Sequence, residues 1–400
     1  MSNPAALERR LQYAGPALFA YGFRPFFLGG AIWAVVALAL WVFQLSGNVI
    51  LPTKLAPLDW HIHEMLYGYV AAIVAGFLLT AIPNWTGRLP ICGGSLAALA
   101  TLWLGGRLSM LLSAEIGGVA AAVIDVAFLA TLAAVAAREI VAGRNWRNLR
   151  VLAVLMVLIA GNVVFHAEAL AYGAADYGTR IGIGSAIALI TLIGGRIVPS
   201  FTRNWLARRD AGRLPVPFTR YDAVTITVSA AALTLWVAIP VGIVTGAVLL
   251  VAAALQAGRL ARWAGERTLA DRLVLVLHVG YAFVPIGFAL VGLALIAPTW
   301  LPTTAGIHAW TAGAIGLMTL AVMTRASLGH TGRPLAASPG TQAIYVLALA
   351  AALLRIGAAI TASSAMLDFA AVAWIAAFGG FVALYGPLLA SHRPVWAGRR

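Results

Sequence analysis

Residues 63–82 read HEMLYGYVAAIVAGFLLTAI, an apolar stretch in which the only Asp, Glu, Lys or Arg is Glu64, near its start. A segment of about 20 apolar residues is long enough to cross a bilayer as a helix. The residues just before it, Trp60-His61-Ile62, add a second histidine at the mouth of this helix. The stretch therefore predicts a membrane span with two imidazoles at one end.

The composition of the whole chain agrees with a membrane protein. The 400 residues are 62% hydrophobic and 10% charged, with a mean hydropathy of +0.92, which excludes an ordinary soluble domain. We expect an all-α polytopic protein with a single transmembrane domain over residues 1–400 and the lipid bilayer as its surroundings. Twelve candidate spans are Phe26 to Leu45, His63 to Ile82, Ser95 to Leu112, Ile116 to Ala137, Leu149 to Leu170, Arg180 to Val198, Ala223 to Ala238, Val241 to Leu260, Leu273 to Ala297, Gly306 to Thr324, Thr341 to Thr361 and Leu367 to Ala390.

The net charge of +14 comes from basic residues that gather in alternate loops. This pattern is typical of membrane insertion and argues against nucleic acid as a partner. Arg9 and Arg10 precede the first span, further arginines follow each even-numbered span, and Lys54 and Arg180 are the exceptions in the other loops. We therefore expect a multi-pass protein with both termini in the cytoplasm.

Two further features limit how the chain is processed and what it binds. No apolar core with a cleavage site precedes the first span, so we expect that span to be retained. Cys92 is the only cysteine, which excludes an internal disulfide, a Cys-x-x-Cys-His haem attachment and an iron–sulfur cluster within the chain. Any haem must be held without a covalent bond.

The second, sixth and tenth spans end alike. Each leaves toward the same side through Thr and Arg, in the segments Thr80 to Arg88, Arg196 to Trp205 and Thr324 to Pro334. Because these spans are four apart, the recurrence suggests three four-helix repeats.

Four of the seven histidines fall at one depth, near the outer ends of the second, fifth and tenth spans: His61, His63, His166 and His308. Positions i and i+2 of a helix lie about 200° apart, so His61 and His63 face opposite ways and each could meet its own cofactor. Glu64 could fix the tautomer of one imidazole, as carboxylates do at metal sites. Imidazole suits iron, copper and zinc alike. The alternative is that these histidines are packed or bonded to water.

Other polar residues within spans are weaker candidates. Arg24 lies among aromatic residues at the entry to the first span and either snorkels or binds a propionate or a headgroup. His278 and Tyr281 share a face in the inner half of the ninth span, where they could serve a proton path or a second cofactor. Arg107 and Asp125 are expected to pair with each other, because an unpaired charge in lipid is costly. Glu64 and Glu168 are candidate outer proton carriers.

Four motifs resemble the NnrS family of bacterial membrane proteins. They are residues 60–65 (WHIHEM), 75–88 (AGFLLTAIPNWTGR), 199–205 (PSFTRNW) and 323–334 (MTRASLGHTGRP). The resemblance implies a twelve-span protein of the bacterial inner membrane that carries haem and copper and serves in nitric oxide metabolism or defence during denitrification. The histidines that look like the family's candidate ligands are His61, His63, His166, His278, His308 and His330.

The architecture is also distantly similar to the core of haem-copper oxidases and nitric oxide reductases, which has twelve spans in three arcs. That core has histidines on spans two, six, seven and ten. Here the sixth and seventh spans have none, and the His-x-His pair is on the second. A haem-copper centre would therefore take its ligands from different helices.

The leading hypothesis is a membrane protein with haem b and copper that binds nitric oxide and either reduces it or protects the cell from it. In this hypothesis His61, His63, His166 and His308 hold the haem iron and a nearby copper, with Arg24 and His278 as further cofactor contacts and His330 as a further metal ligand. Glu64 and Tyr281 would move protons, and an unidentified donor would supply electrons. The alternatives are a secondary transporter of a small solute or metal and a haem sensor without turnover.

Overall fold

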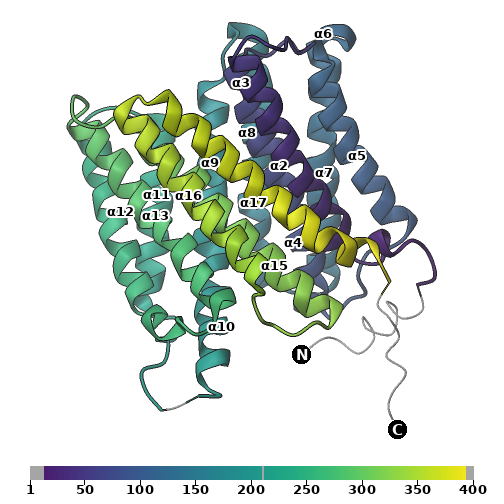
Figure 1. Cartoon of the computed structure of the whole chain (residues 1–400), viewed down its shortest axis with the longest axis vertical. Coiled ribbons are helices and arrows are strands. Elements are labelled where there is room, and N and C mark those ends of the chain that lie inside the picture. The colour runs from purple at the N-terminus through teal and green to yellow at the C-terminus, as the bar shows by residue number, and fades with distance from the viewer. Residues whose placement is uncertain (1–12, 210, 393–400) are drawn as a thin grey trace.

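The structure is a computed structural model that describes residues 13–209 and 211–392. Every regular element within these ranges is a helix, and most run roughly parallel to one long axis (Figure 1). This confirms the predicted all-α polytopic fold. Arg9, Arg10, Arg393, Arg399 and Arg400, which entered the charge argument, lie outside the described ranges.

The first four spans follow a short turn, η1 (Ala17–Phe19). Their helices are α2 (Phe23–Leu45), the continuous series α3 (Pro57–His63), η2 (Glu64–Val70) and α4 (Ala71–Thr86), then α5 (Gly94–Leu111) and α7 (Gly118–Ala142), with the single turn α6 (Ser113–Ile116) between the last two.

The next four spans begin after the turn η3 (Trp146–Asn148). They are α8 (Leu149–Tyr172), the series α9 (Asp176–Leu189), η4 (Ile190–Gly194) and α10 (Gly195–Leu206), then α11 (Arg220–Ala238) and α12 (Ile243–Ala261).

The last four spans begin after the turn η5 (Gly265–Thr268). They are α13 (Arg272–Ile296), the series α14 (Thr303–His308), η6 (Ala309–Ile315) and α15 (Gly316–Thr331), then α16 (Pro339–Thr361) and α17 (Ser364–Ala390).

Among the described residues, eleven of these segments are long and apolar enough to cross a membrane. The remaining predicted span, the third along the chain, is α5, an 18-residue helix whose hydropathy is lowered by Arg107. That guanidinium is buried and paired with carboxylates, which offsets the cost of placing it in the bilayer. We therefore count α5 as a span.

The second, sixth and tenth spans share a feature that the sequence did not predict. Each contains a π-helical segment, η2, η4 or η6, in which the helix widens by part of a turn. These three spans are also the most buried: 78%, 61% and 67% of their most apolar stretches are inside the protein, against 33–50% for the other eight of the eleven. The recurrence at every fourth span supports three four-helix units.

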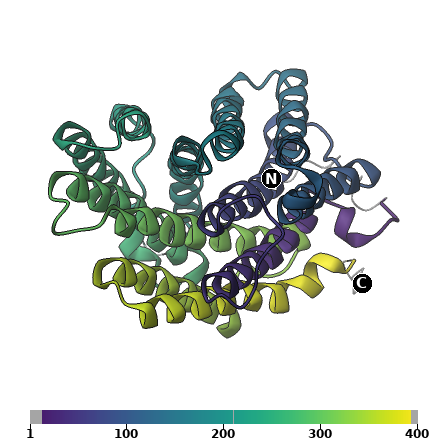
Figure 2. The same ribbon diagram turned by 90° about the horizontal axis from the view of Figure 1, so that it is seen from above.

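The three units close on one another. The helix α9 packs against both η2 and η6, so the spans with π segments meet in the interior. The last helix, α17, packs against the first long helix, α2, and the two lie side by side when the protein is seen from above (Figure 2). The chain thus returns to its starting point around a buried centre.

The Thr-Gly-Arg sequences that end the second and tenth spans are helix stops. Thr86 and Thr331 donate their hydroxyls to carbonyls one turn back, and the next residues, Gly87 and Gly332, both have a φ of 72°. Glycine adopts this left-handed conformation without strain and so ends a helix cleanly.

Successive spans run in opposite directions, which places the arginine-bearing loops together. We call the end with the loops that follow α4, α7, α10, α12 and α15 the arginine-rich end, and the opposite end the arginine-poor end. The start of α2 and the finish of α17 both lie at the arginine-rich end, where Arg24 donates to the carbonyl of Ser391. The start of α3, with His61, lies at the arginine-poor end (Figure 1).

Candidate functional site

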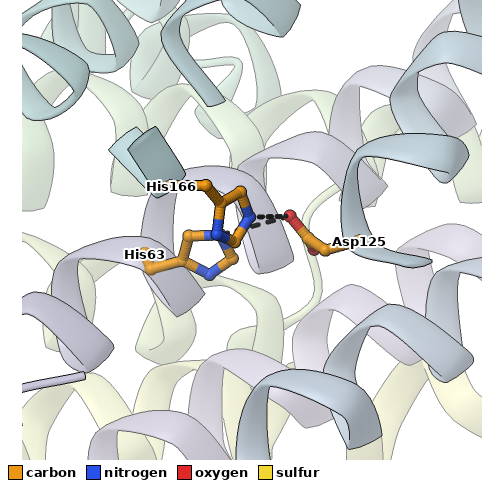
Figure 3. Close-up of side chains that lie close together, drawn as sticks. All are labelled: His63, Asp125 and His166. Atoms are coloured by element: carbon orange, nitrogen blue, oxygen red, sulfur yellow. Dashed lines mark hydrogen bonds and ion pairs between the residues drawn. The ribbon is translucent and has the colours of Figure 1, made fainter. Parts of the chain in front are cut away.

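A buried polar cluster lies near the arginine-poor end, between the first five spans. It contains a His-Asp-His group, His63, Asp125 and His166, whose potential ligand atoms all lie within 4.8 Å of one another (Figure 3). Four side chains surround this group: Trp33, Glu64, Arg107 and Asn162. All seven residues are buried, and Trp33 and His166 are the most exposed, at 8% and 6%.

Glu64 orients His63 from within the same helical series. The His63 Nδ1 lies 2.9 Å from Glu64 Oε1, which is the contact expected from the sequence. When Nδ1 donates to this carboxylate, the Nε2 atom carries a lone pair. That atom lies 3.2 Å from Asp125 Oδ2 and 3.2 Å from Asn162 Oδ1, both of which are acceptors. The lone pair of His63 Nε2 then faces two other acceptor atoms, and this arrangement requires a shared proton or a metal ion between them.

His166 completes the group from α8. Its Nε2 lies 3.0 Å from Asp125 Oδ2, the same oxygen that His63 faces and that accepts from Asn162 Nδ2 at 2.8 Å. Two imidazoles and a carboxylate are a donor set that suits iron, copper or zinc. The carboxylate behind His63 matches the outer support that metal-bound histidines usually have.

The charges of the cluster also favour a cation. Arg107 donates to Glu64 Oε2 at 2.7 Å and forms an ion pair with Asp125, which was expected to be its partner. Trp33 Nε1 donates to the same Glu64 oxygen at 2.6 Å. Two carboxylates against one guanidinium leave one negative charge in a buried site, and an uncompensated buried charge is costly. A bound metal ion or a protonated histidine would balance it.

The backbone is shaped to admit Arg107. Gly68 lies in η2, and a Cβ there would collide with the Arg107 guanidinium and come within 2.9 Å of Glu64 Oε2. Trp103 Nε1 donates to the Gly68 carbonyl at 3.0 Å, which fixes the π segment against α5. The widened helix and its glycine therefore create the space in which the charged cluster assembles.

The other two outer histidines line a separate cavity of about 340 Å³. His61 comes from α3 and His308 from the end of α14, and the walls are almost wholly apolar. Trp41 of α2 stacks on the His61 ring with a centroid distance of 4.1 Å and an interplanar angle of 20°. Among the described residues, the only charged side chain that lines the cavity is Arg355 of α16. The volume of the cavity is in the range of cavities that hold small molecules and cofactors.

Both histidines of this cavity have ring nitrogens available for a ligand. The Thr311 hydroxyl donates to the Ile307 carbonyl at 3.0 Å and lies 3.3 Å from His308 Nδ1, so it can accept from that nitrogen and leave Nε2 with a lone pair. His61 Nδ1 is buried and has no hydrogen-bond partner among the described residues. An orphaned imidazole nitrogen beside an apolar cavity fits a site built for a bound group.

The expected division between His61 and His63 is present. His61 faces the apolar cavity and His63 faces the polar cluster, from opposite sides of one helical turn. The four outer histidines thus form two pairs, His61 with His308 and His63 with His166. The sequence had placed all four at one depth without separating them.

Tyr281 and His278 lie outside both sites. Tyr281 donates to Gln256 Oε1 at 2.8 Å and accepts from Arg259 at 3.1 Å, and Arg259 in turn pairs with Asp222 at 3.1 Å. His278 lies 2.8 Å from the Thr202 hydroxyl. These contacts give both residues structural partners, although His278 Nδ1 is buried without one among the described residues. Their expected roles in proton movement or cofactor binding stay predictions.

Arg24 and His330 lie at the arginine-rich end. Arg24 donates to the carbonyls of Leu389 at 2.8 Å and Ser391 at 2.9 Å, which ties the start of α2 to the finish of α17. His330 packs against the rings of Tyr21 and Phe23. Neither residue lines the cavity or belongs to the His-Asp-His group, so their predicted roles as a propionate contact and a metal ligand gain no support from geometry.

Glu168, a predicted outer proton carrier, caps α9. Its carboxylate accepts from the backbone nitrogens of Tyr177 at 3.0 Å and Gly178 at 2.8 Å. Negative charge at a helix start is favourable, and this contact fixes the turn between α8 and α9 next to His166.

Three residues of these sites were missed from the sequence: Trp33, Asn162 and Arg355. Nothing in the spacing of Trp33 or Asn162 marks them, because their partners lie on other spans. Arg355 did carry a signal, since it is a charge within the eleventh span and such charges are functional candidates by default.

A larger cavity of about 710 Å³ lies at the arginine-rich end, between the finish of α4, the start of α5 and the finish of α7. Its charged side chains satisfy one another, because Arg88 and Arg138 both pair with Glu139. No histidine within residues 13–209 and 211–392 lines it. It therefore lacks the donor atoms that the two histidine sites share.

Comparison with known proteins identifies the family to which this arrangement belongs. No curated protein matches the chain. The family model described as NnrS protein matches residues 17–393, which cover all twelve spans and both histidine sites. The chain therefore belongs to the NnrS family.

Proposed function

We propose that the protein binds haem b and copper in the bacterial inner membrane and uses them to bind nitric oxide, which it reduces or removes to protect the cell. The observation that carries this proposal is the presence of two different donor sets on opposite faces of one helical turn. One is apolar with two imidazoles, and the other is polar with two imidazoles and a carboxylate.

The cavity of His61 and His308 is the proposed haem site. His61 and His308, from different spans, would hold the haem, and the apolar walls would exclude water from it. Since the only cysteine, Cys92, lies at the arginine-rich end, this haem would be non-covalent. The Trp41 ring would hold the plane of His61.

The His-Asp-His group is the proposed copper site. His63, Asp125 and His166 provide nitrogen and oxygen ligands, and their net negative charge favours a cation. These donors suit several metals, so the choice of copper rests on what the family resemblance implies.

The residues of the polar cluster could also manage protons. Reduction of two nitric oxide molecules to nitrous oxide and water consumes two electrons and two protons. Haem and copper supply a place for nitric oxide to bind and accept electrons. His166, which contacts Asp125 at 3.0 Å, is the most exposed of the titratable residues of the cluster, and a proton could enter there. Glu64 holds one tautomer of His63 throughout.

Nitric oxide is small, uncharged and soluble in lipid, so it can reach either site through the bilayer. Electrons require a partner that remains to be identified. The excess of arginine at one end supports the proposal that this end faces the cytoplasm, by the positive-inside rule. The two sites would then lie near the periplasmic surface.

The test is a visible spectrum of the detergent-purified full-length protein, oxidised and dithionite-reduced, before and after nitric oxide, with metal content measured on the same sample. The proposal predicts a b-type reduced spectrum that shifts with nitric oxide, and copper near one per chain. A colourless, metal-free protein from haem-replete cells would refute it and favour a transporter. A spectral shift without consumption of nitric oxide under reducing conditions would favour a sensor.

A further inference from the structure

Arg355 is a charged side chain without a visible partner. It lies in the part of α16 nearest the arginine-poor end and faces the cavity of His61 and His308. Among the described residues it makes no hydrogen bond, ion pair or ring contact, although it is only partly exposed. A guanidinium within a membrane span normally pairs with an acid or with backbone carbonyls.

The other two four-helix units show what such an arginine usually meets. In the first unit, Arg107 of α5 pairs with Asp125 of the adjacent α7 and with Glu64. In the second, Arg259 of α12 pairs with Asp222 of the adjacent α11 at 3.1 Å. Each of these units therefore balances a buried arginine with an aspartate from the neighbouring span.

The third unit lacks the corresponding acid. The helix α17, which packs beside α16, has a single acidic residue, Asp368, and that residue is exposed and forms no ion pair with Arg355 among the described contacts. No Asp or Glu in the part of the chain that the structure describes lines the cavity. The pair Arg259–Asp222 lies toward the arginine-rich end, so Arg107 is the arginine that matches Arg355 in depth. Where Arg107 meets Asp125, Arg355 borders the cavity.

The neighbouring imidazoles cannot replace an acid. His61 and His308 are neutral or, if protonated, carry the same charge as Arg355. A cation beside an apolar cavity keeps a large desolvation cost unless an anion joins it. The geometry is therefore that of a site that an anionic group of a ligand would complete.

We propose that Arg355 binds a carboxylate of the ligand that fills this cavity. The ligand is thus an apolar molecule with an acidic edge, and that edge points toward α16. The identity of the ligand rests on the proposed function, in which it is haem b and the carboxylate is a propionate. The planar guanidinium can donate two parallel hydrogen bonds to one carboxylate, which would fix the rotation of the macrocycle between the two histidines.

The experiment compares haem b with its dimethyl ester, in which both carboxylates are blocked. Full-length protein purified from haem-deficient cells is titrated with each compound in detergent, and the dissociation constants are obtained from the absorption change. The wild-type protein is expected to prefer haem over the ester by about tenfold to a hundredfold, because the ester cannot form the charge-assisted bonds. Arg355→Gln should bind both compounds with similar, weaker affinity, and Arg355→Lys should keep part of the preference.

Arg180→Gln is the matched control. Arg180 is also a span arginine near the arginine-poor end, but it stacks on Tyr177 and donates to the Val237 carbonyl at 3.2 Å. This variant should keep the wild-type preference.

The outcomes separate the two proposals. If the wild-type protein binds neither compound, the haem assignment fails and the role of Arg355 falls with it. If haem binds but the wild-type protein takes the ester equally well, or if Arg355→Gln keeps the full preference, the role of Arg355 alone is refuted. The comparison in wild-type protein decides the question even if the variant does not fold.

Discussion

Replacing Asp125 with asparagine should remove the metal while leaving most of the fold intact. The substitution keeps the shape of the side chain and removes one negative charge. Asp125 Oδ2 lies 3.2 Å from His63 Nε2 and 3.0 Å from His166 Nε2, and it is the only acidic group in the His-Asp-His set. With asparagine, Glu64 and Arg107 would balance each other and the site would no longer need a cation.

The size of the effect follows from the contacts. Removal of a supporting residue behind a metal ligand costs about 10-fold to 100-fold in affinity, so loss of the ligand itself should cost more than about 100-fold. Breaking a buried ion pair typically lowers the free energy of unfolding by about 3–5 kcal/mol. The loss should be smaller here, because Arg107 keeps its 2.7 Å contact with Glu64. A loss of about 1–3 kcal/mol is expected.

Metal content per chain and the affinity measured by chelator competition test this prediction, together with thermal unfolding in detergent. Asp222→Asn is the control, since Asp222 also pairs with a buried arginine but lies outside the metal site. The control should lose stability and keep its metal. An Asp125→Asn protein that binds metal as tightly as wild type would show that the His-Asp-His group is not the metal site.

Three further substitutions test separate parts of the structure. Gly68→Ala should cost about 1–3 kcal/mol of unfolding free energy and lower the metal content, because its Cβ would displace Arg107. The control Gly105→Ala, where the nearest atom to an added Cβ is 3.9 Å away, should be tolerated, and thermal unfolding and metal analysis would show whether the two differ. Trp41→Leu should reduce haem per chain in a pyridine haemochrome assay, because it removes the ring stacked on His61. The control Trp300→Leu, at a tryptophan that is 87% exposed, should not, and equal loss in both would argue against a specific role for the stack. Arg259→Leu should destabilise the protein by about 1–3 kcal/mol, because it removes the donor to Asp222 and Tyr281 while Asp222 keeps Arg262 at 3.5 Å, and haem and metal per folded chain should be unchanged. Cofactor loss without a drop in unfolding temperature would instead give this cluster a functional role.

The spans could be predicted from the sequence because each one depends on local composition. Runs of about 20 apolar residues between arginine-bearing loops are enough to count helices, and the span over residues 63–82 was located to within a few residues of the series Pro57–Thr86. The π segments could not be predicted, because the residue they share also occurs inside ordinary α-helices, as at Gly161 of α8. That residue is a glycine at the fifth position of each segment: Gly68, Gly194 and Gly313. The segments become visible as a repeat only when hydrogen bonding is known.

The histidine sites were predicted in part. The opposite facing of His61 and His63 follows from helix geometry, and the pairing of Arg107 with Asp125 follows from the cost of a lone charge in lipid. Which histidine joins which could not be predicted, because His308 and His166 reach their partners through the packing of spans far apart in the sequence.

Arg355 also shows that the sequence alone does not identify contacts between spans. A charge in a span predicts a contact, but the sequence cannot say whether an aspartate of another helix or a ligand supplies it. For Arg107 the structure provides Asp125, and for Arg355 it provides a cavity. The distinction depends on three-dimensional packing.

The central claim is that one helical turn serves two separate sites, and the most direct measurement compares His61→Ala with His63→Ala. Haem and copper are determined on both purified variants from the same growth conditions, with His392→Ala as a control at an exposed histidine outside both sites. The account predicts that His61→Ala loses haem and keeps copper, that His63→Ala loses copper and keeps haem, and that the control keeps both. If either variant loses both cofactors while still folded, or if both variants keep both, the assignment of the two faces to two sites is contradicted.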